Sequence, residues 1–142
     1  MSALSPEEQH AINAQRLAHL ATADSEAVPH LIPVCFHYDG DHFYSVLDQK
    51  PKRTEVTNLK RVRNILANPR VALVIDHWQE EWHGLWYVLV NGTADLLYEG
   101  PEQQAAVAAL RRKYPQYRAM HLDNKPVIRI TPTNIVRWGH PA

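Results

Sequence analysis

Between Lys50 and Arg70 the sequence gathers positive charge, and this stretch is where its residue types first suggest chemistry. Glu55 is the one acidic residue in the stretch, whereas the whole chain has fifteen basic and fifteen acidic residues. An arginine pairs well with two oxygens of a phosphate or carboxylate, and a lysine supplies a compact positive charge. The stretch therefore predicts a site for an anionic ligand, with a solvated helix face as the alternative. Its basic members are Lys50, Lys52, Arg53, Lys60, Arg61, Arg63 and Arg70.

A polar loop and a helix divide these basic residues between them. Residues 50–54 predict the loop, in which Thr54 adds a hydroxyl donor. Residues 55–67 predict the helix, because apolar side chains recur there at near-helical spacing and Asn68-Pro69 then ends it. The start of a helix favours anions, which supports an anionic ligand in this region.

The rest of the pattern predicts strands joined in sequence. Asp39-Gly40 between apolar runs is a strong hairpin signal. Pro33 lacks a backbone donor, so its strand is expected at a sheet edge or a bulge, and the run 85–98 is expected to break or bulge at Asn91-Gly92. So many sequential strands favour a mostly β fold, an antiparallel barrel with helices covering its ends. The expected helices are 6 to about 16, 55–67 and 100–114, and the expected strands are 17–23, 30–38, 42–47, 71–76, 85–98, 127–131 and 134–138.

Composition and charge narrow the class of protein. With 142 residues and a hydrophobic content of 45%, the chain is expected to form one domain over 1–142. A net charge of zero argues against nucleic acid as a partner. The N-terminal segment does not read as a signal peptide, and no apolar run approaches the roughly 20 residues that span a bilayer. We therefore expect a cytoplasmic protein that does not associate with membranes.

Other reactive residue types are present without the spacing that a metal or a nucleophile would need. The nine histidines show no His-Glu-x-x-His pattern and no Cys-x-x-Cys partner, so no metal site is expected. Cys35, the only cysteine, is expected to pack within a strand. The four tryptophans are expected in the core or at a subunit interface, with stacking on a ring cofactor as the alternative.

Several short motifs, in their order along the chain, resemble one known family. They are Leu-Ala-Thr at 20–22, Pro-His at 29–30, Pro-Val at 33–34 and Asn-Pro-Arg-Val-Ala-Leu at 68–73. Over about 17–138 the chain resembles the flavin-binding split-barrel proteins of the pyridoxamine-phosphate-oxidase-like superfamily. It departs from true pyridoxamine phosphate oxidases in being shorter and in lacking their C-terminal substrate-binding extension, so pyridoxamine phosphate is not the expected substrate. The stretches most similar to a subgroup that uses the deazaflavin coenzyme F420 are 48–54, 76–86 and 113–117.

The resemblance implies a homodimeric antiparallel split β-barrel with its cofactor sites at the subunit interface. The helix residue that grips the cofactor phosphate in this family corresponds to Arg61, where phosphate oxidases usually have lysine. The loop before this helix and the strand that lines the cofactor ring supply further contacts, and the partner subunit is expected to add aromatic side chains. The implied cofactor-binding residues are Pro33, Val34, Cys35, Lys50, Lys52, Arg53, Thr54, Arg61, Trp86 and Trp138, with Tyr87 beside them.

The implied function is that of an oxidoreductase that uses F420, or alternatively FMN, for hydride transfer to or from a small organic substrate. The cofactor carries out this chemistry, so no acid–base pair is required and no catalytic residue is assigned. The tail of F420 carries a phosphate and several carboxylates, which suits the many basic residues better than the single phosphate of FMN. A non-catalytic protein that binds or carries the same cofactor is the alternative.

Overall fold

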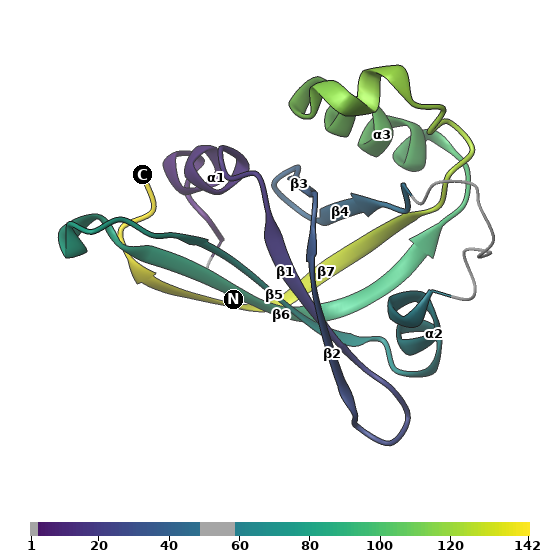
Figure 1. Cartoon of the computed structure of the whole chain (residues 1–142), viewed down its shortest axis with the longest axis horizontal. Coiled ribbons are helices and arrows are strands. Elements are labelled where there is room, and N and C mark those ends of the chain that lie inside the picture. The colour runs from purple at the N-terminus through teal and green to yellow at the C-terminus, as the bar shows by residue number, and fades with distance from the viewer. Residues whose placement is uncertain (1–2, 49–58) are drawn as a thin grey trace.

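The structure, a computed structural model, describes residues 3–48 and 59–142 and contains a strongly curled sheet (Figure 1). Seven strands join in the order β2-β1-β5-β6-β7-β4-β3. Every strand pair in the described residues is antiparallel. The mostly β, antiparallel split barrel expected from the sequence is thereby confirmed. Its strands are β1 (Ala18–Ala23), β2 (Pro29–Val34), β3 (His37–Tyr38), β4 (Phe43–Val46), β5 (Arg70–His77), β6 (Trp86–Leu97) and β7 (Val127–Gly139).

The helices lie close to their predicted positions but are shorter. The first helix begins as predicted, with a capping box between Ser5 and Glu8, and it ends at Asn13. There the Asn13 side-chain amide exchanges hydrogen bonds of 2.8 and 2.9 Å with the backbone of Tyr38. The predicted start of the second helix, at residue 55, lies outside the described residues. Among the helices of the described residues, none is long and apolar enough to cross a membrane. The helices are α1 (Pro6–Asn13), α2 (Lys60–Ala67) and α3 (Pro101–Lys113), with short 3₁₀ turns η2 (Trp82–Gly84) and η3 (Pro115–Ala119).

Buried and exposed side chains alternate along the central strands, so the sheet has a buried inner face and an accessible outer face. In β6, Val88 and Val90 are fully buried, whereas Tyr87 and Asn91 are exposed. This period of two follows from the pleat, which turns successive side chains to opposite faces of the sheet. Buried residues of α1 and α2 share one hydrophobic core with this inner face. The two helices therefore cover the inner side and leave the outer side of these strands accessible.

One irregularity in the pairing of β6 with β7 merges two predicted strands into one. The sequence predicted a break after Thr131, but β7 continues through Pro132 to its end. The pairing register shifts between Asn91 and Gly92, where the sequence predicted a break or bulge. A Cβ atom on Gly92 would lie 2.4 Å from the carbonyl oxygen of Thr131. The missing side chain at Gly92 thus provides the room in which β7 passes its proline without ending.

Both edges of the sheet follow the sequence prediction in part. The edge strand β2 contains Pro33, which has no N–H to offer a further strand. The Asp39-Gly40 turn joins β3 to β4, as predicted. The single strand predicted over 30–38 is wrong, because it divides at Cys35 and Phe36. The backbone N–H of Phe36 bonds the hydroxyl of Tyr114, at 3.1 Å, in place of a neighbouring strand.

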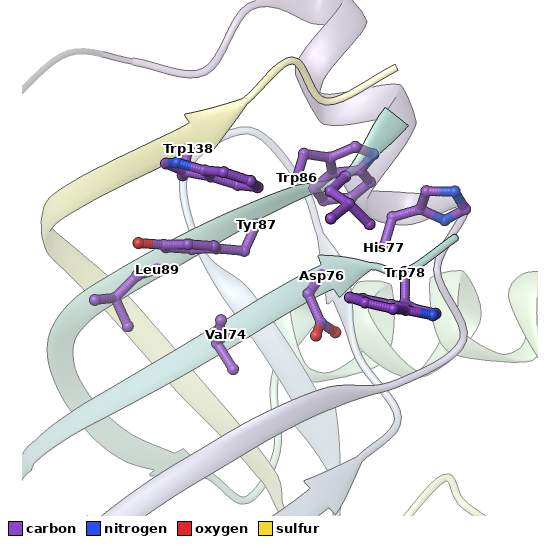
Figure 2. A pocket seen from close by; sticks show the side chains of 9 residues that line it. Val74, Asp76, His77, Trp78, Trp86, Tyr87, Leu89 and Trp138 are labelled. Carbon is purple, nitrogen blue, oxygen red and sulfur yellow. The ribbon is translucent and has the colours of Figure 1, made fainter. Parts of the chain in front are cut away.

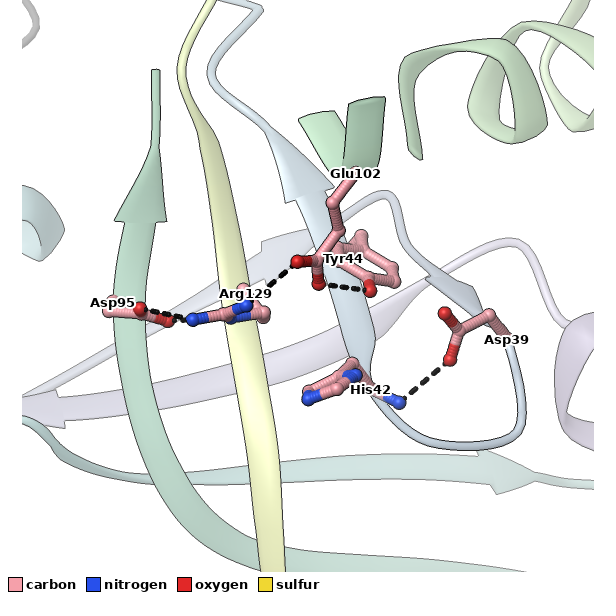
Figure 3. A network of polar contacts seen from close by, with 6 residues as sticks. All are labelled: Asp39, His42, Tyr44, Asp95, Glu102 and Arg129. Carbon is pink, nitrogen blue, oxygen red and sulfur yellow. Dashed lines mark hydrogen bonds and ion pairs between the residues drawn. The ribbon is translucent and has the colours of Figure 1, made fainter. Parts of the chain in front are cut away.

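A charged network attaches the start of α3 to three neighbouring strands (Figure 3). The guanidinium of Arg129 on β7 donates to both carboxylate oxygens of Asp95 on β6, at 3.0 and 2.7 Å. It also donates to Oε1 of Glu102, in the first turn of α3, at 2.8 Å. The hydroxyl of Tyr44 on β4 donates to the other Glu102 oxygen at 2.7 Å. The beginning of α3 is therefore fixed, and the far end of the helix reaches the candidate site.

We expect Gly92→Ala to lower the free energy of unfolding by about 1–3 kcal/mol, because the new methyl group has no space beside the Thr131 carbonyl. Thr93→Ala, at the exposed neighbouring position, is the control and should change it by less than about 1 kcal/mol. Urea unfolding followed by tryptophan fluorescence measures both. An equal loss in the two variants would show that the close approach at Gly92 is not what limits this position.

Candidate functional site

Four of the sequence-predicted residues line one pocket, here called the Arg61 pocket. Its volume is about 200 Å³. Pro33, Val34 and Cys35, at the end of β2, contribute to its wall, and Arg61 lines it from α2. The fold thus brings together the strand end and the basic helix that the sequence named separately. The lining residues are Leu17, Pro33, Val34, Cys35, Ser45, Val46, Asp48, Arg61 and Tyr117.

Arg61 is the one cation among the described residues that line this pocket. Its Nε–H is buried and has no hydrogen-bond partner within residues 3–48 and 59–142. Burial lowers the pKa of Arg61 below its ordinary value, and the nearby Asp48 and Tyr117 act in the opposite direction. A buried donor without a partner is costly. The Arg61 pocket therefore presents a position for an oxygen acceptor, such as that of a phosphate, carboxylate or carbonyl group.

Asp48 supplies a negative charge to the same pocket. Its Oδ2 accepts a hydrogen bond from the Tyr117 hydroxyl at 2.5 Å. Burial and this hydrogen bond raise the pKa of Tyr117 above its ordinary value, so the phenol keeps its proton and remains a donor. Asp48, shortly after β4, and Arg61, on α2, both line the pocket. The ion pairs among the described residues do not include one between these two side chains.

The end of α3 holds the pocket wall in place. The Tyr114 hydroxyl accepts the Phe36 N–H and donates to the carbonyl oxygen of Arg16 at 2.8 Å. The ammonium of Lys113 donates to the Phe36 carbonyl at 2.9 Å, and its Nζ lies 3.7 Å from the centre of the Phe36 ring. Burial, together with the neighbouring Arg16 guanidinium, lowers the pKa of Lys113 to about 7. These bonds fix Phe36, and with it the adjacent Cys35.

The other basic residues of the sequence-predicted stretch divide into two groups. Arg63 and Arg70 are exposed, as the solvated-face alternative anticipated. Lys60 lies 3.7 Å from Asp24, in an ion pair at the surface. Within the described ranges, no three His, Cys, Asp or Glu side chains gather where they could hold a metal ion. The predicted cofactor contacts that lie outside the described residues, and so stay predictions, are Lys50, Lys52, Arg53 and Thr54.

Sequence reasoning missed Asp48 and Tyr117 as residues of the site. Asp48 begins the stretch 48–54 and Tyr117 ends the stretch 113–117, and part of the family resemblance rested on both stretches. Both residues were therefore inside quoted motifs. Their pairing required the fold, because 69 positions separate them in the sequence.

A second, larger pocket of about 470 Å³, here called the aromatic pocket, contains the predicted tryptophans. Tyr87 and Trp138 face each other across β6 and β7, and their rings stack with centroids 5.8 Å apart (Figure 2). Trp138 is 51% exposed, whereas Trp86 is 3% exposed and stacks on His77. Trp138 and Tyr87 thus offer surface to another molecule, and Trp86 mainly supports its own core. The lining residues are Val74, Asp76, His77, Trp78, Leu85, Trp86, Tyr87, Leu89 and Trp138.

The aromatic pocket continues into an apolar outer face of the sheet. The strand register places Val74, Leu89 and Val136 in one row across β5, β6 and β7. Val136 is 40% exposed, and Leu31 on the edge strand β2 is 65% exposed. Several large apolar side chains exposed on one face are typical of an interaction surface.

Comparison with known proteins identifies relatives of this architecture. The family model for pyridoxamine 5'-phosphate oxidase matches residues 4–139. Among curated protein sequences, none matches the chain significantly.

Solved structures share the fold at low sequence identity. The conserved hypothetical protein Rv2991 from Mycobacterium tuberculosis superposes with a TM-score of 0.76 at 19% identity, over 96% of this chain and 86% of that chain. The heme storage protein HutZ from Vibrio cholerae gives 0.70 at 13% identity, over 97% and 95%. A protein described as an F420 reductase gives 0.66 at 19% identity, over 94% and 98%. At such identities the likeness establishes the fold alone.

Lys113 makes the stability of the pocket wall depend on pH. Its pKa of about 7 in the folded chain lies below the ordinary 10.5 of lysine, so between these values the unfolded chain binds one more proton than the folded chain. The free energy of unfolding should therefore rise with pH across this window. Chemical unfolding at a series of pH values measures the slope.

Two variants of Lys113 test this assignment. Lys113→Met should remove the contribution of this residue to the slope. Lys113→Arg keeps a positive charge at every pH, so it should be less stable than the wild type near the upper end of the window. A slope in Lys113→Met as steep as in the wild type would contradict the assignment.

Proposed function

Because the chain belongs to the pyridoxamine 5'-phosphate oxidase family, we propose that it is an oxidoreductase that uses coenzyme F420, or alternatively FMN, to transfer hydride to or from a small organic substrate. We place the anionic part of the cofactor at Arg61. The proposed compartment is the cytoplasm.

The unpartnered Nε–H of Arg61 carries this proposal. It is buried in a pocket whose other wall is the end of β2, and the described part of the chain gives it no acceptor. Hydrogen bonds from a charged donor to a phosphate are among the stronger polar contacts in proteins. The predicted loop residues Lys50, Lys52, Arg53 and Thr54 come shortly before Arg61 in the sequence and are proposed to bind the rest of the anionic tail.

The residues of this chain are proposed to bind and orient the cofactor. When bound, F420 or FMN supplies the hydride chemistry, and the protein supplies position, electrostatics and exclusion of water. Arg61 holds the anionic group, and the backbone and side chains of Pro33, Val34 and Cys35 lie along the ring. Tyr114 and Lys113 are proposed to act indirectly, because their bonds to Phe36 hold the adjacent Cys35 in position.

A homodimer is the proposed working form. The exposed Leu31, Val136 and Trp138 give the outer sheet face the apolar character of a subunit interface. In such a dimer the Arg61 pocket of one subunit is proposed to bind the anionic tail, and Tyr87 and Trp138 of the aromatic pocket of the other to cover the ring. Trp86 would support this surface from within its own core.

A non-catalytic carrier of the same cofactor is the second candidate. The fold also occurs in HutZ, which is described as a heme storage protein, so the architecture serves storage as well as chemistry. Both candidates need the same binding site. Turnover separates them: reduction of bound F420 or FMN and its reoxidation by a substrate would occur only in the oxidoreductase.

We expect Arg61→Ala and Lys52→Ala each to weaken cofactor binding by at least about 1 kcal/mol, which is roughly fivefold in Kd, because each removes a charged hydrogen bond. Fluorescence titration with F420 and with FMN measures both affinities. Arg63→Ala, on the exposed side of the same helix, is the matched control and should leave them nearly unchanged. Affinities unchanged in both Arg61→Ala and Lys52→Ala would discredit the assigned site.

We expect Trp138→Glu and Val136→Glu to convert a dimeric wild-type protein towards monomers, because each places a charge on the apolar outer face. Sedimentation velocity measures the state of assembly, and the same samples should lose cofactor affinity. Tyr98→Glu, at an exposed position just beyond β6, is the control and should stay dimeric. A monomeric wild type that binds cofactor at full affinity would rule out a site shared between subunits.

A further inference from the structure

The Arg61 pocket contains a feature that an ordinary phosphate site would not need. Asp48 places a carboxylate in the same small cavity as the guanidinium of Arg61. The hydrogen bond from Tyr117 holds this carboxylate, and Tyr117 is itself only 5% exposed. The carboxylate is therefore a fixed part of the wall, close enough to Arg61 to act on its charge.

A fixed negative charge penalises anionic ligands in proportion to their own charge. Coulomb energy is linear in each charge, so a group with two negative charges meets twice the repulsion that a group with one meets at the same place. A phosphate monoester, whose second pKa is about 6, carries close to two negative charges at neutral pH. A phosphodiester carries one. FMN ends in a monoester, and the phosphate of F420 is a diester.

We propose that Asp48, held by Tyr117, is a specificity-determining residue that shifts the preference of the Arg61 pocket from the doubly charged monoester of FMN towards the singly charged phosphodiester of F420. This inference rests on the proposed function, since it requires the cofactor phosphate to lie at Arg61. Arg61 attracts the doubly charged group more strongly than the singly charged one, and Asp48 opposes this preference by repelling the doubly charged group more strongly.

The test removes the charge and keeps the shape. Asp48→Asn retains an oxygen that accepts the Tyr117 hydroxyl, and Asp48→Ser repeats the change with a smaller side chain. The three probes are riboflavin, which has no phosphate, F420 and FMN. Their affinities for the wild type and for both variants are measured by fluorescence titration at one neutral pH.

The expected gains in affinity form a series. The affinity for riboflavin should change by less than about twofold. The affinity for FMN should rise at least about tenfold, because the variants remove a negative charge that repels the nearby dianion through water. F420 should gain less, by about the square root of the FMN factor from its phosphate and by a smaller amount from the carboxylates further along its tail. For a tenfold gain in FMN affinity, the ratio of FMN affinity to F420 affinity should therefore rise by up to about threefold. An unchanged ratio, or weaker FMN binding in the Asp48 variants, would overturn the proposal.

Two further variants separate this inference from the function on which it rests. Asp123→Asn removes the same charge from an exposed residue outside the pocket, and it should leave the FMN to F420 ratio unchanged. An equal rise in Asp123→Asn would assign the effect to net charge and overturn the role of Asp48. If Arg61→Ala and Lys52→Ala both leave the two affinities unchanged, the assigned cofactor site of the proposed function fails. If Arg61→Ala weakens both while Asp48→Asn leaves the ratio unchanged, the charge discrimination alone fails.

Discussion

The hydroxyl of Tyr114 joins three segments that are far apart in the sequence, and the geometry of the candidate site depends on it. It accepts the Phe36 N–H and donates to the Arg16 carbonyl, across 78 and 98 residues. Tyr114 is 8% exposed, so these bonds form in a place where an unpaired backbone group would be costly. The break between β2 and β3 is possible because the phenol takes over a bond that a strand would have supplied. The bonds of the Tyr114 hydroxyl therefore set the position of Cys35 in the pocket wall and the path of the chain from Tyr114 to Tyr117.

The second constraint is the balance of charge in the Arg61 pocket. One guanidinium and one carboxylate line a cavity of about 200 Å³, and Tyr117 fixes the carboxylate. The buried Nε–H of Arg61 is left without an acceptor among the described residues. A protein that only needed stability would gain by pairing this donor. In the proposed function, an oxygen of the ligand accepts this hydrogen bond.

The Arg61 pocket and the aromatic pocket have complementary character. The Arg61 pocket is polar and charged, and the aromatic pocket offers the stacked rings of Tyr87 and Trp138. A flavin or deazaflavin cofactor combines an anionic tail with a flat ring system, so its two parts match the characters of the two pockets. The outer sheet face carries exposed apolar side chains such as Leu31 and Val136, and the proposed dimer rests on this face. The network around Arg129 contributes by fixing the start of α3, whose far end carries Lys113 and Tyr114.

Local signals in the sequence determined much of the fold, and the family resemblance named four of the nine residues that line the Arg61 pocket. The edge position of Pro33, the Asp39-Gly40 turn and the irregularity at Gly92 follow from backbone chemistry that each residue carries by itself. The basic stretch contained Arg61 among seven cations, and the family resemblance singled it out. Only the tertiary structure decided which of its cations is buried and which, like Arg63, face solvent, because burial depends on what packs against a helix. The pairing of Asp48 with Tyr117, the division of the predicted strand at Phe36, and the burial of Trp86 beside an exposed Trp138 had no local signal, since each arises from contacts between segments distant in the sequence.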